Sequence, residues 1–380
     1  MIRLHTKQHV NWTGLTSAIL LFGMLAGCTL APTTPAPSPI PSPTPLATAT
    51  LATDDQGLSA DEIATLSSLT QLDDFPLYTL KFTGAYPPPI LTAVNTRLVK
   101  NTDLAAPNAC QAGWGCSLFA ALGDPTSRFY GRNFDWRFSP ALLLFTNPPD
   151  GYASVSLVDI EYLGFESTWA IGLTSLPLEK RRGLLDAPAL PFDGMNERGL
   201  AIGMASVPPG KMHPDPNKKT IDQLVVMREI LDHAATIDEA VNILAAYNID
   251  MGNVPLHYLV ASAAGDAALV EFYQGKMVVF RNKDPWLHAT NFLVASTGGQ
   301  PQGQCPRYDR ISQRLQETGG RLTTQDVLSL LAGVALDGPY TESTTQWSVV
   351  YDLTGGSVNI VMGRKYKGEV HRLHLSMNGK

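Results

Sequence analysis

The chain has 380 residues, of which 44% are hydrophobic, and its formal net charge at pH 7 is −6. An acidic chain without a basic tract lacks the electrostatic footprint of nucleic-acid-binding proteins, so that class is excluded. Beyond the first 54 residues, enough chain remains for one large globular domain.

The first residues are expected to direct export. Two basic residues precede an apolar stretch from Leu15 to Met24, which is too short to span a bilayer, so a signal peptide is predicted. Its Leu-Ala-Gly-Cys ending resembles a bacterial lipoprotein signal, in which residues 1–27 are removed and Cys28 receives the lipid. The alternative is a plain secretory signal that is cleaved elsewhere.

Residues 28–54 are rich in Pro, Thr, Ala and Ser and are predicted to form an extended tether. Such a segment buries no apolar surface and therefore does not join a folded core. We expect the lipid on Cys28 to attach the protein to a membrane of the bacterial cell envelope, on the extracytoplasmic side.

Beyond the tether, the hydrophobic pattern alternates between the periods typical of helices and of strands. The first predicted elements are a helix at residues 61–69 and a strand at 77–82. The next strands are predicted at 117–121, 128–133, 153–160, 168–173 and 200–205. Later segments predict helices at 221–231, 237–246 and 307–317, and strand hairpins at 256–280 and 347–363. Strand clusters separated by helices favour an α+β fold with a layered core.

Cys116 has the most informative surroundings in the sequence. The segment from Gly131 to Trp136 is expected to be a strand that returns beside it. A cysteine attacks carbonyl groups best with a base close by, and its own α-amine, with a reference pKa of about 7.7–8.0, becomes that base once the bond to Gly115 is cut. Arg132 and Asp135 would then hold the thiolate and the ammonium. The alternative is a buried structural cysteine before a hairpin.

This pattern predicts an N-terminal-nucleophile (Ntn) hydrolase made as a precursor. Cleavage would divide the folded part into an N-terminal segment, residues 55–115, and a catalytic segment, residues 116–380. One further cysteine lies in each segment, Cys110 and Cys305. In an oxidising compartment a disulfide between them would join the two pieces, although spacing alone does not fix the pairing.

Several segments, in the same order along the chain, resemble the linear-amide C–N hydrolases of the choloylglycine hydrolase family. This group of Ntn hydrolases includes penicillin V acylase, acyl-CoA:6-aminopenicillanate acyltransferase and acid ceramidase. The resemblance covers about residues 75–366. The matching segments are residues 115–117, 131–136, 193–200, 257–272, 288–292, 306–310 and 347–353.

The resemblance implies a four-layer αββα sandwich and a hydrolase that cleaves linear amide bonds of small N-acyl compounds. It implies no cofactor and no metal. By position it makes Cys116 the nucleophile, and makes Asn291 the side-chain donor of the oxyanion hole, which stabilises the charge that develops on the attacked carbonyl. The remaining site residues are Arg132 and Asp135, which steady the thiol and amine, and Arg307, which orders the charged network.

The resemblance also implies a backbone donor for the oxyanion hole and a pocket for the acyl body of the substrate. The backbone donor of the oxyanion hole falls at Ser206, where the usual Asn or Tyr of the family is absent. The pocket for the acyl body is expected in apolar loops at residues 138–146 and 207–211, because binding residues concentrate in loops.

Three other interpretations compete with this one. A papain-like enzyme would combine Cys116 with His257 or His288 and with Asn291, but it would leave the segment from Gly131 to Trp136 unexplained. A second possibility is a non-catalytic binding protein on the same scaffold. The third is an acyltransferase, which would pass the same thioester to an amine. Hydrolysis is favoured over transfer because an exported protein meets abundant water.

Overall fold

A computed structural model describes residues 57–86, 110, 115–165, 172–210, 213–252, 254–338 and 343–378. The chain divides into residues 1–50 and residues 51–380, and all described residues belong to the second unit. The predicted signal peptide, Cys28 and the tether lie outside the described residues. Within the described ranges, no helix combines the length and the apolar character needed to cross a membrane.

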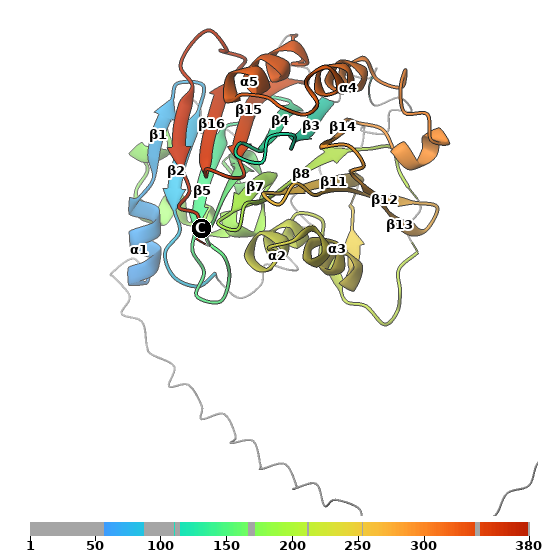
Figure 1. Ribbon diagram of the computed structural model, residues 1–380. Helices are drawn as coiled ribbons and strands as arrows, with labels where there is room; N and C mark the ends of the chain where they lie inside the picture. The colour runs from blue at the N-terminus through green and yellow to red at the C-terminus, as the bar shows by residue number, and fades with distance from the viewer. Residues whose placement is uncertain are drawn as a thin grey trace, which may run out of the picture. The chain divides into compact units, whose positions relative to one another are not determined.

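Two large sheets form the centre of the folded unit (Figure 1). The six-stranded sheet is antiparallel throughout and has the order β14 (Trp286–Ala289), β3 (Gly115–Ala121), β4 (Phe129–Trp136), β15 (Thr344–Asp352), β16 (Ser357–Met362) and β17 (His371–His374). The nine-stranded sheet has the order β1 (Thr70–Asp73), β2 (Leu77–Lys81), β5 (Ala141–Thr146), β6 (Ser154–Asp159), β7 (Asp193–Asn196), β8 (Leu200–Ser206), β11 (Leu256–Ser262), β12 (Ala267–Tyr273) and β13 (Lys276–Arg281).

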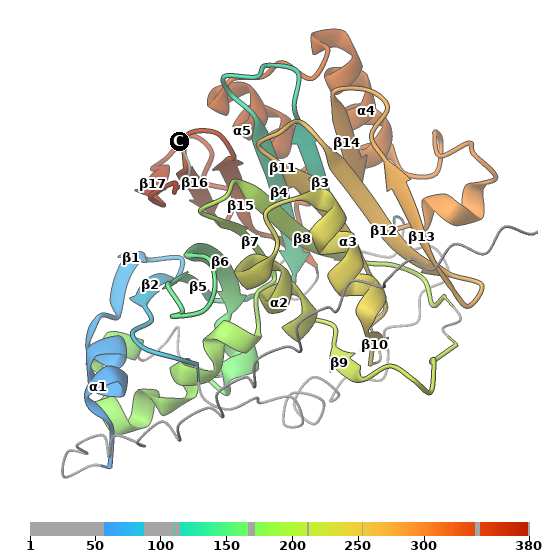
Figure 2. The same ribbon diagram turned by 60° about the horizontal axis from the view of Figure 1, so that its bottom comes forward.

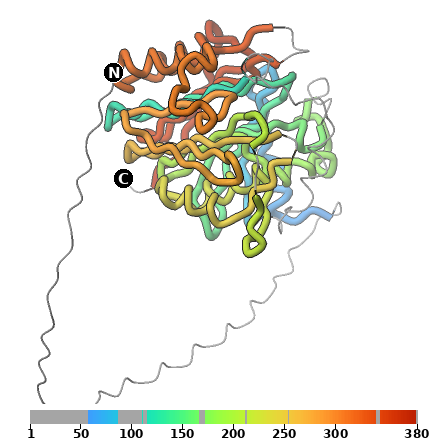
Figure 3. Tube along the Cα trace, turned by 90° about the vertical axis from the view of Figure 1, so that its right-hand side faces the viewer, coloured from blue at the N-terminus to red at the C-terminus, as the bar shows by residue number. Residues whose placement is uncertain are grey.

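Helices cover the outer face of each sheet. Helices α4 (Pro306–Thr318) and α5 (Thr324–Gly333) pack on the six-stranded sheet, whereas α2 (Val225–His233) and α3 (Ile237–Ala246) pack on the nine-stranded sheet (Figures 1 and 2). The sheets face each other through contacts of β3 with β8 and β11. The two helical layers lie on opposite sides of the sheets, orange to red and yellow-green in Figure 3. The predicted α+β fold, a four-layer αββα sandwich, is confirmed.

Strand β3 shows how the sequence pattern builds these layers. Successive side chains of a strand point to opposite faces. Cys116, Leu118 and Ala120 accordingly join the apolar core between the sheets, whereas Phe119 and Ala121 join the core beneath α4 and α5. The strand is buried on both faces, which explains its nearly continuous apolar sequence.

The segment upstream of Cys116 is part of the folded unit. Helix α1 (Ala60–Ser67) begins at Ser59 with a capping box, in which Ser59 and Glu62 satisfy each other's backbone N–H groups. The following hairpin adds β1 and β2 to the nine-stranded sheet, where β2 lies parallel to β5. Leu77 and Leu80 of β2 are fully buried. The upstream segment therefore supplies core residues.

Some predicted boundaries are wrong. The helix expected at 221–231 begins only at Val225, because Thr220–Asp222 forms strand β9, which pairs in parallel with β10 (Asn248–Asp250). Of the strand predicted at 168–173, residues 168–171 lie outside the described residues, and Leu173 starts a 3₁₀ turn. A second 3₁₀ segment, Leu178–Ala189, and helix α5 were not predicted.

Candidate active site

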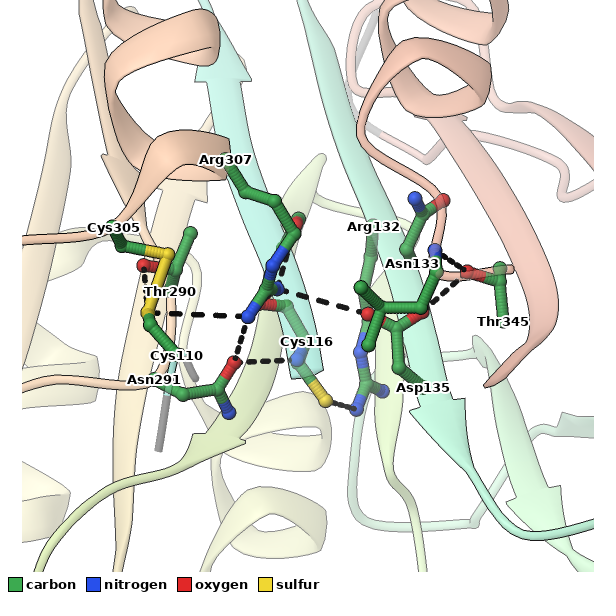
Figure 4. Close-up of polar contacts among 12 residues, drawn as sticks. Cys110, Cys116, Arg132, Asn133, Asp135, Thr290, Asn291, Cys305, Arg307 and Thr345 are labelled. Atoms are coloured by element: carbon green, nitrogen blue, oxygen red, sulfur yellow. Dashed lines mark hydrogen bonds and ion pairs between the residues drawn. A yellow bond between two sulfur atoms is a disulfide. The ribbon is translucent and has the colours of Figure 1, made fainter. Parts of the chain in front are cut away.

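The pairing of β3 with β4 places the predicted site residues next to one another. Gly115 lies opposite Asp135, and Leu118 lies opposite Arg132. Because side chains alternate along a strand, Arg132 shares the inter-sheet face with Cys116, whereas Asp135 points toward the layer of α4 and α5. Figure 4 shows Cys116 between these residues and a second group from outside the hairpin, Asn291 and Arg307.

Each polar atom of Cys116 contacts a different side chain. Its backbone N–H donates to Asn291 Oδ1 at 2.7 Å, and its carbonyl oxygen accepts a hydrogen bond from Arg307 Nη1 at 2.7 Å. Its Sγ lies 3.8 Å from Arg132 Nη2, within hydrogen-bonding range for sulfur. All four residues are buried. The structure thus brings together four of the five predicted catalytic residues around one backbone position.

Burial raises the pKa of the Cys116 thiol, and the positive charge of Arg132 acts in the opposite direction. Arg132 is itself held firmly, since its Nη1 donates to the carbonyl of Phe192 at 2.6 Å and its Nη2 to the carbonyl of Met204 at 3.1 Å. The thiol therefore needs a further base before it becomes a nucleophile.

Asp193 is a buried residue of this network that the sequence analysis did not identify. It forms an ion pair with Arg132 and accepts hydrogen bonds from Tyr351 Oη at 2.5 Å and Trp347 Nε1 at 3.3 Å. The side chain compensates the charge of the buried guanidinium. Its segment was one of those matched to the family, but a carboxylate next to a glycine also fits an ordinary turn, so the sequence offered no specific signal for this role.

Asp135, the fifth predicted residue, lies beside the bond expected to be cut. Its Oδ1 accepts a hydrogen bond from Thr345 Oγ1 at 2.5 Å, and its Oδ2 lies 3.7 Å from Arg307 Nη1. Among the described residues, Oδ2 has no hydrogen-bond partner. Burial raises the pKa of Asp135 to about 6, although Arg307 opposes the shift. A Cβ atom on Gly115 would lie 2.7 Å from Oδ2, so only glycine fits there without displacement.

Asn291 contacts Cys116, Arg307 and Ser206. Its Oδ1 also accepts a hydrogen bond from Arg307 Nη2 at 3.1 Å. Its Nδ2, the atom expected to donate to an oxyanion, donates to the carbonyl oxygen of Ser206 at 2.9 Å and to Ser206 Oγ at 3.1 Å. Ser206, the predicted backbone donor, therefore lies in contact with Asn291.

In the structure a disulfide joins Cys110 to Cys305. Cys305 directly precedes α4, whose second residue is Arg307. Cys110 Sγ lies 4.0 Å from Arg307 Nη2 and 3.7 Å from Thr290 Oγ1. The disulfide therefore connects the segment upstream of Cys116 to the element that positions Arg307.

A cavity opens beside Cys116, and much of its lining is aromatic. Phe134 packs edge to face on Phe192, and Tyr162 lies 5.2 Å from Phe192 between ring centroids. The rest of the lining combines polar and aliphatic residues. The full set is Cys116, Phe134, Asp135, Trp136, Tyr162, Phe192, Met204, Ser206, Asp222, Gln223, Leu224, Gly252, Val254 and Leu256.

The predicted pocket loops do not line this cavity. Residues 141–146 form strand β5 inside the nine-stranded sheet, because their continuous apolar run suits a buried strand. Residues 207–210 follow β8 but are not among the lining residues, and residue 211 lies outside the described part of the chain.

The two histidines of the papain-like alternative have other surroundings. His257 Nδ1 lies 3.2 Å from Glu271 Oε1, and both side chains are fully buried. His288 packs on Tyr308 with 4.0 Å between ring centroids, and burial lowers its pKa to about 4. Within the described ranges, no hydrogen bond joins either histidine to Cys116, and no group of three or more His, Cys, Asp or Glu residues is arranged to hold a metal ion.

An αββα sandwich with a cysteine at the start of a central strand is the architecture of the N-terminal-nucleophile hydrolases. Within that class, residues 116–291 match the family described as linear amide C–N hydrolases, choloylglycine hydrolase family, and the match begins at Cys116. The family resemblance predicted from the sequence is therefore confirmed.

Individual relatives show the same likeness at low identity. Penicillin V acylase from Pectobacterium atrosepticum is 30% identical over 104 residues, which cover 24% of this chain and 28% of that protein. A variant of conjugated bile acid hydrolase from Clostridium perfringens has a TM-score of 0.50 at 16% identity and covers 68% of this chain and 92% of its own. Penicillin V acylase from Agrobacterium tumefaciens has a TM-score of 0.48 at 17% identity, covering 69% and 86%.

Proposed function

We propose that the protein is an exported, lipid-anchored amidase that cleaves linear amide bonds of N-acyl compounds after cutting its own Gly115–Cys116 bond. The observation that carries this proposal is the arrangement around Cys116, whose N, O and Sγ atoms each contact a different buried side chain. A structural cysteine needs no such set of partners. The start of the family match at Cys116 supports the same residue as the first of the mature chain.

Cleavage would convert the nitrogen of Cys116 from an amide into an α-amine without moving it far. This nitrogen already faces Asn291 Oδ1, and Oδ2 of Asp135, which accepts no hydrogen bond from the described residues, lies beside Gly115. A new ammonium would find two acceptors there. Because the reference pKa of an α-amine is about 7.7–8.0, the group is suited to exchange protons with the thiol near neutral pH.

In the proposed reaction Sγ loses its proton to the α-amine and attacks the amide carbon of the substrate. The oxygen of the tetrahedral intermediate would be stabilised by Asn291 Nδ2, with Ser206 Oγ giving way as hydrogen-bond partner. The α-ammonium then returns the proton to the leaving amine, which leaves an acyl thioester on Cys116. Water hydrolyses the thioester and releases the acid and the free thiol.

The cavity supports a substrate with an apolar acyl body, because Phe134, Trp136, Tyr162 and Phe192 lie along it next to Cys116. Export is supported by the signal-like sequence that ends at Cys28, and by the disulfide, since disulfides persist in oxidising compartments.

Intact-mass measurement and N-terminal sequencing of the purified protein test the proposal. We expect wild-type protein to yield a chain that starts at Cys116, and we expect Cys116→Ala to remain a single chain without amidase activity. Ser329→Ala is a control substitution, since Ser329 is exposed on α5, where its hydroxyl donates to the carbonyl of Gln325, and this variant should still be cleaved. An active enzyme with an intact Gly115–Cys116 bond would contradict the proposal.

A further inference from the structure

Asp222 is a buried carboxylate whose surroundings satisfy only one of its two oxygens. It is the last residue of strand β9 and precedes α2 in the chain. Figure 2 labels both elements. Its Oδ1 accepts hydrogen bonds from the backbone N–H groups of Leu224 at 2.7 Å and Val225 at 3.4 Å. Its Oδ2 is buried and has no hydrogen-bond partner in the described part of the chain. A role at the start of α2 explains Oδ1 and leaves Oδ2 unexplained.

Asp222 lines the same cavity as Cys116. The aromatic residues of the cavity come from β4, from the turn after β6 and from the residue preceding β7, whereas the polar lining residues Asp222 and Gln223 come from the end of β9 and the residue after it. A substrate whose apolar body packs on the aromatic residues would thus meet a carboxylate elsewhere in the same cavity.

The charge around Asp222 favours a positive or hydrogen-donating ligand. Burial raises the pKa of Asp222, and the negative charge of Asp250, its partner in the β9–β10 pair, acts in the same direction. Among the described residues, no salt bridge to an Arg, Lys or His is formed by Asp222. A buried carboxylate without a cation gains most from a charge-assisted hydrogen bond, and a second anion next to it is repelled.

On the basis of the proposed function, we propose that Asp222 selects the substrate by accepting a hydrogen bond from it. The site then takes N-acyl amides that carry an ammonium group, or a neutral hydrogen-bond donor, in preference to those that carry a carboxylate or sulfonate. Asp222 is in this view a specificity residue of the amidase and takes no part in bond breaking.

Three substrates of similar length test the proposal: the N-phenylacetyl derivatives of 1,2-diaminoethane, ethanolamine and glycine. They share one acyl group and end in an ammonium, a hydroxyl and a carboxylate. Wild-type enzyme should rank them in that order by kcat/KM. Asp222→Asn keeps Oδ1 for the turn before α2, and it should reduce the advantage of the ammonium over the carboxylate substrate about 10- to 100-fold.

Asp238→Asn is a matched control, because Asp238 is an exposed carboxylate on α3 that pairs with Arg281. It should leave the ranking unchanged. Equal losses for all three substrates in Asp222→Asn would show a structural role only and would overturn the proposal. If that variant does not fold, the wild-type ranking decides, and a preference for the carboxylate substrate overturns the proposal.

Calorimetric binding of the same three compounds separates this inference from the proposed function. A protein that binds the ammonium compound best but hydrolyses none of them retains the role of Asp222 and loses the amidase assignment. A protein that hydrolyses all three without preferring the ammonium compound retains the amidase assignment and loses the role of Asp222. Absence of both binding preference and hydrolysis overturns both.

Discussion

At the scale of single residues, the proposed function requires side chains of the site to serve two stages of one protein, before and after cleavage. Asn291 holds the Cys116 N–H of the uncleaved chain through Oδ1, and its Nδ2 is the proposed donor to the oxyanion. Arg307 contacts both Asn291 and the Cys116 carbonyl. Substitutions here are therefore expected to affect maturation as well as turnover.

We predict that Asn291→Ala is cleaved more slowly at Gly115–Cys116, because a buried N–H loses its acceptor. Once matured, the variant should show a kcat lowered about 10²- to 10³-fold with a similar KM, as expected for the loss of one oxyanion donor. Time courses of cleavage on gels, followed by steady-state kinetics, measure the two effects separately. Asn291→Asp keeps an acceptor for the Cys116 nitrogen and should be cleaved faster than Asn291→Ala. Full activity of Asn291→Ala would place the oxyanion hole elsewhere.

Asp159 gives the protein a predictable dependence of stability on pH. Burial raises its pKa from 3.8 to about 7, against the opposing effects of hydrogen bonds from Ser139 and from the Glu161 N–H. The folded state therefore keeps a proton that the unfolded state has lost, so the free energy of unfolding falls as the pH rises from about 4 to 7.

We predict that Asp159→Asn removes this contribution. Between pH 5 and pH 8, the decrease in the free energy of unfolding should be smaller in the variant by about 3 kcal/mol. Urea unfolding in a Cys116→Ala background measures it, since that chain is expected to stay single. The same pH dependence in both proteins would show that Asp159 is ionised throughout this range.

At the scale of elements, local patterns predicted local structure. The apolar run in Ser117–Ala121 and the helical periods over α1 and α3 were sufficient to identify those elements. The capping box at Thr323 was also visible before α5 and was not used. The pairing of β9 with β10 and the parallel contact of β2 with β5 join residues far apart in sequence, so no local pattern predicts them.

The site residues likewise divide into those that a local sequence pattern predicted and those that depend on contacts between distant parts of the chain. Cys116, Arg132 and Asp135 lie on one hairpin, and their spacing was enough to bring them together. Asn291 and Arg307 depended on the family resemblance. Asp193 and Asp222 were missed as site residues, because their roles come from contacts made only after the sheets pack and the cavity forms.

Strand β2 and the disulfide hold the upstream segment in independent ways. We predict that Cys110→Ser is still cleaved and that its two pieces coelute in native gel filtration, since the buried residues of β2 remain packed in the sheet. Under denaturing, non-reducing conditions the pieces should separate in the variant and stay joined in wild type. Cys305→Ser should behave in the same way. Separation of the variant pieces under native conditions would show that the disulfide alone retains the segment.

At the scale of the whole molecule, the proposed lipid and the proposed active site lie on different sides of the cleavage point. After the proposed cleavage, Cys28 would belong to the upstream piece and Cys116 would begin the downstream one. Attachment of the catalytic piece to a membrane would therefore depend on the contacts of the upstream segment.

We predict that Cys28→Ser releases active enzyme into the soluble fraction, because the proposed acyl chains provide the membrane affinity. Fractionation of cells followed by an amidase assay measures the shift, and an unrelated lipoprotein in the same cells serves as the marker for intact membranes. A Cys28→Ser protein that still pellets with membranes would refute the anchor.

The parallel pairing of β2 with β5 makes the order of events during biosynthesis matter. Before cleavage both strands belong to one polypeptide, so their encounter is unimolecular and independent of protein concentration. After cleavage and reduction the pieces would form a heterodimer, and recovery from unfolding would obey mass action. The single-chain precursor would then be the form in which the protein folds, and the two-chain enzyme would only retain the structure acquired before cleavage. Once unfolded in dilute reducing solution, the two chains would not efficiently reassemble.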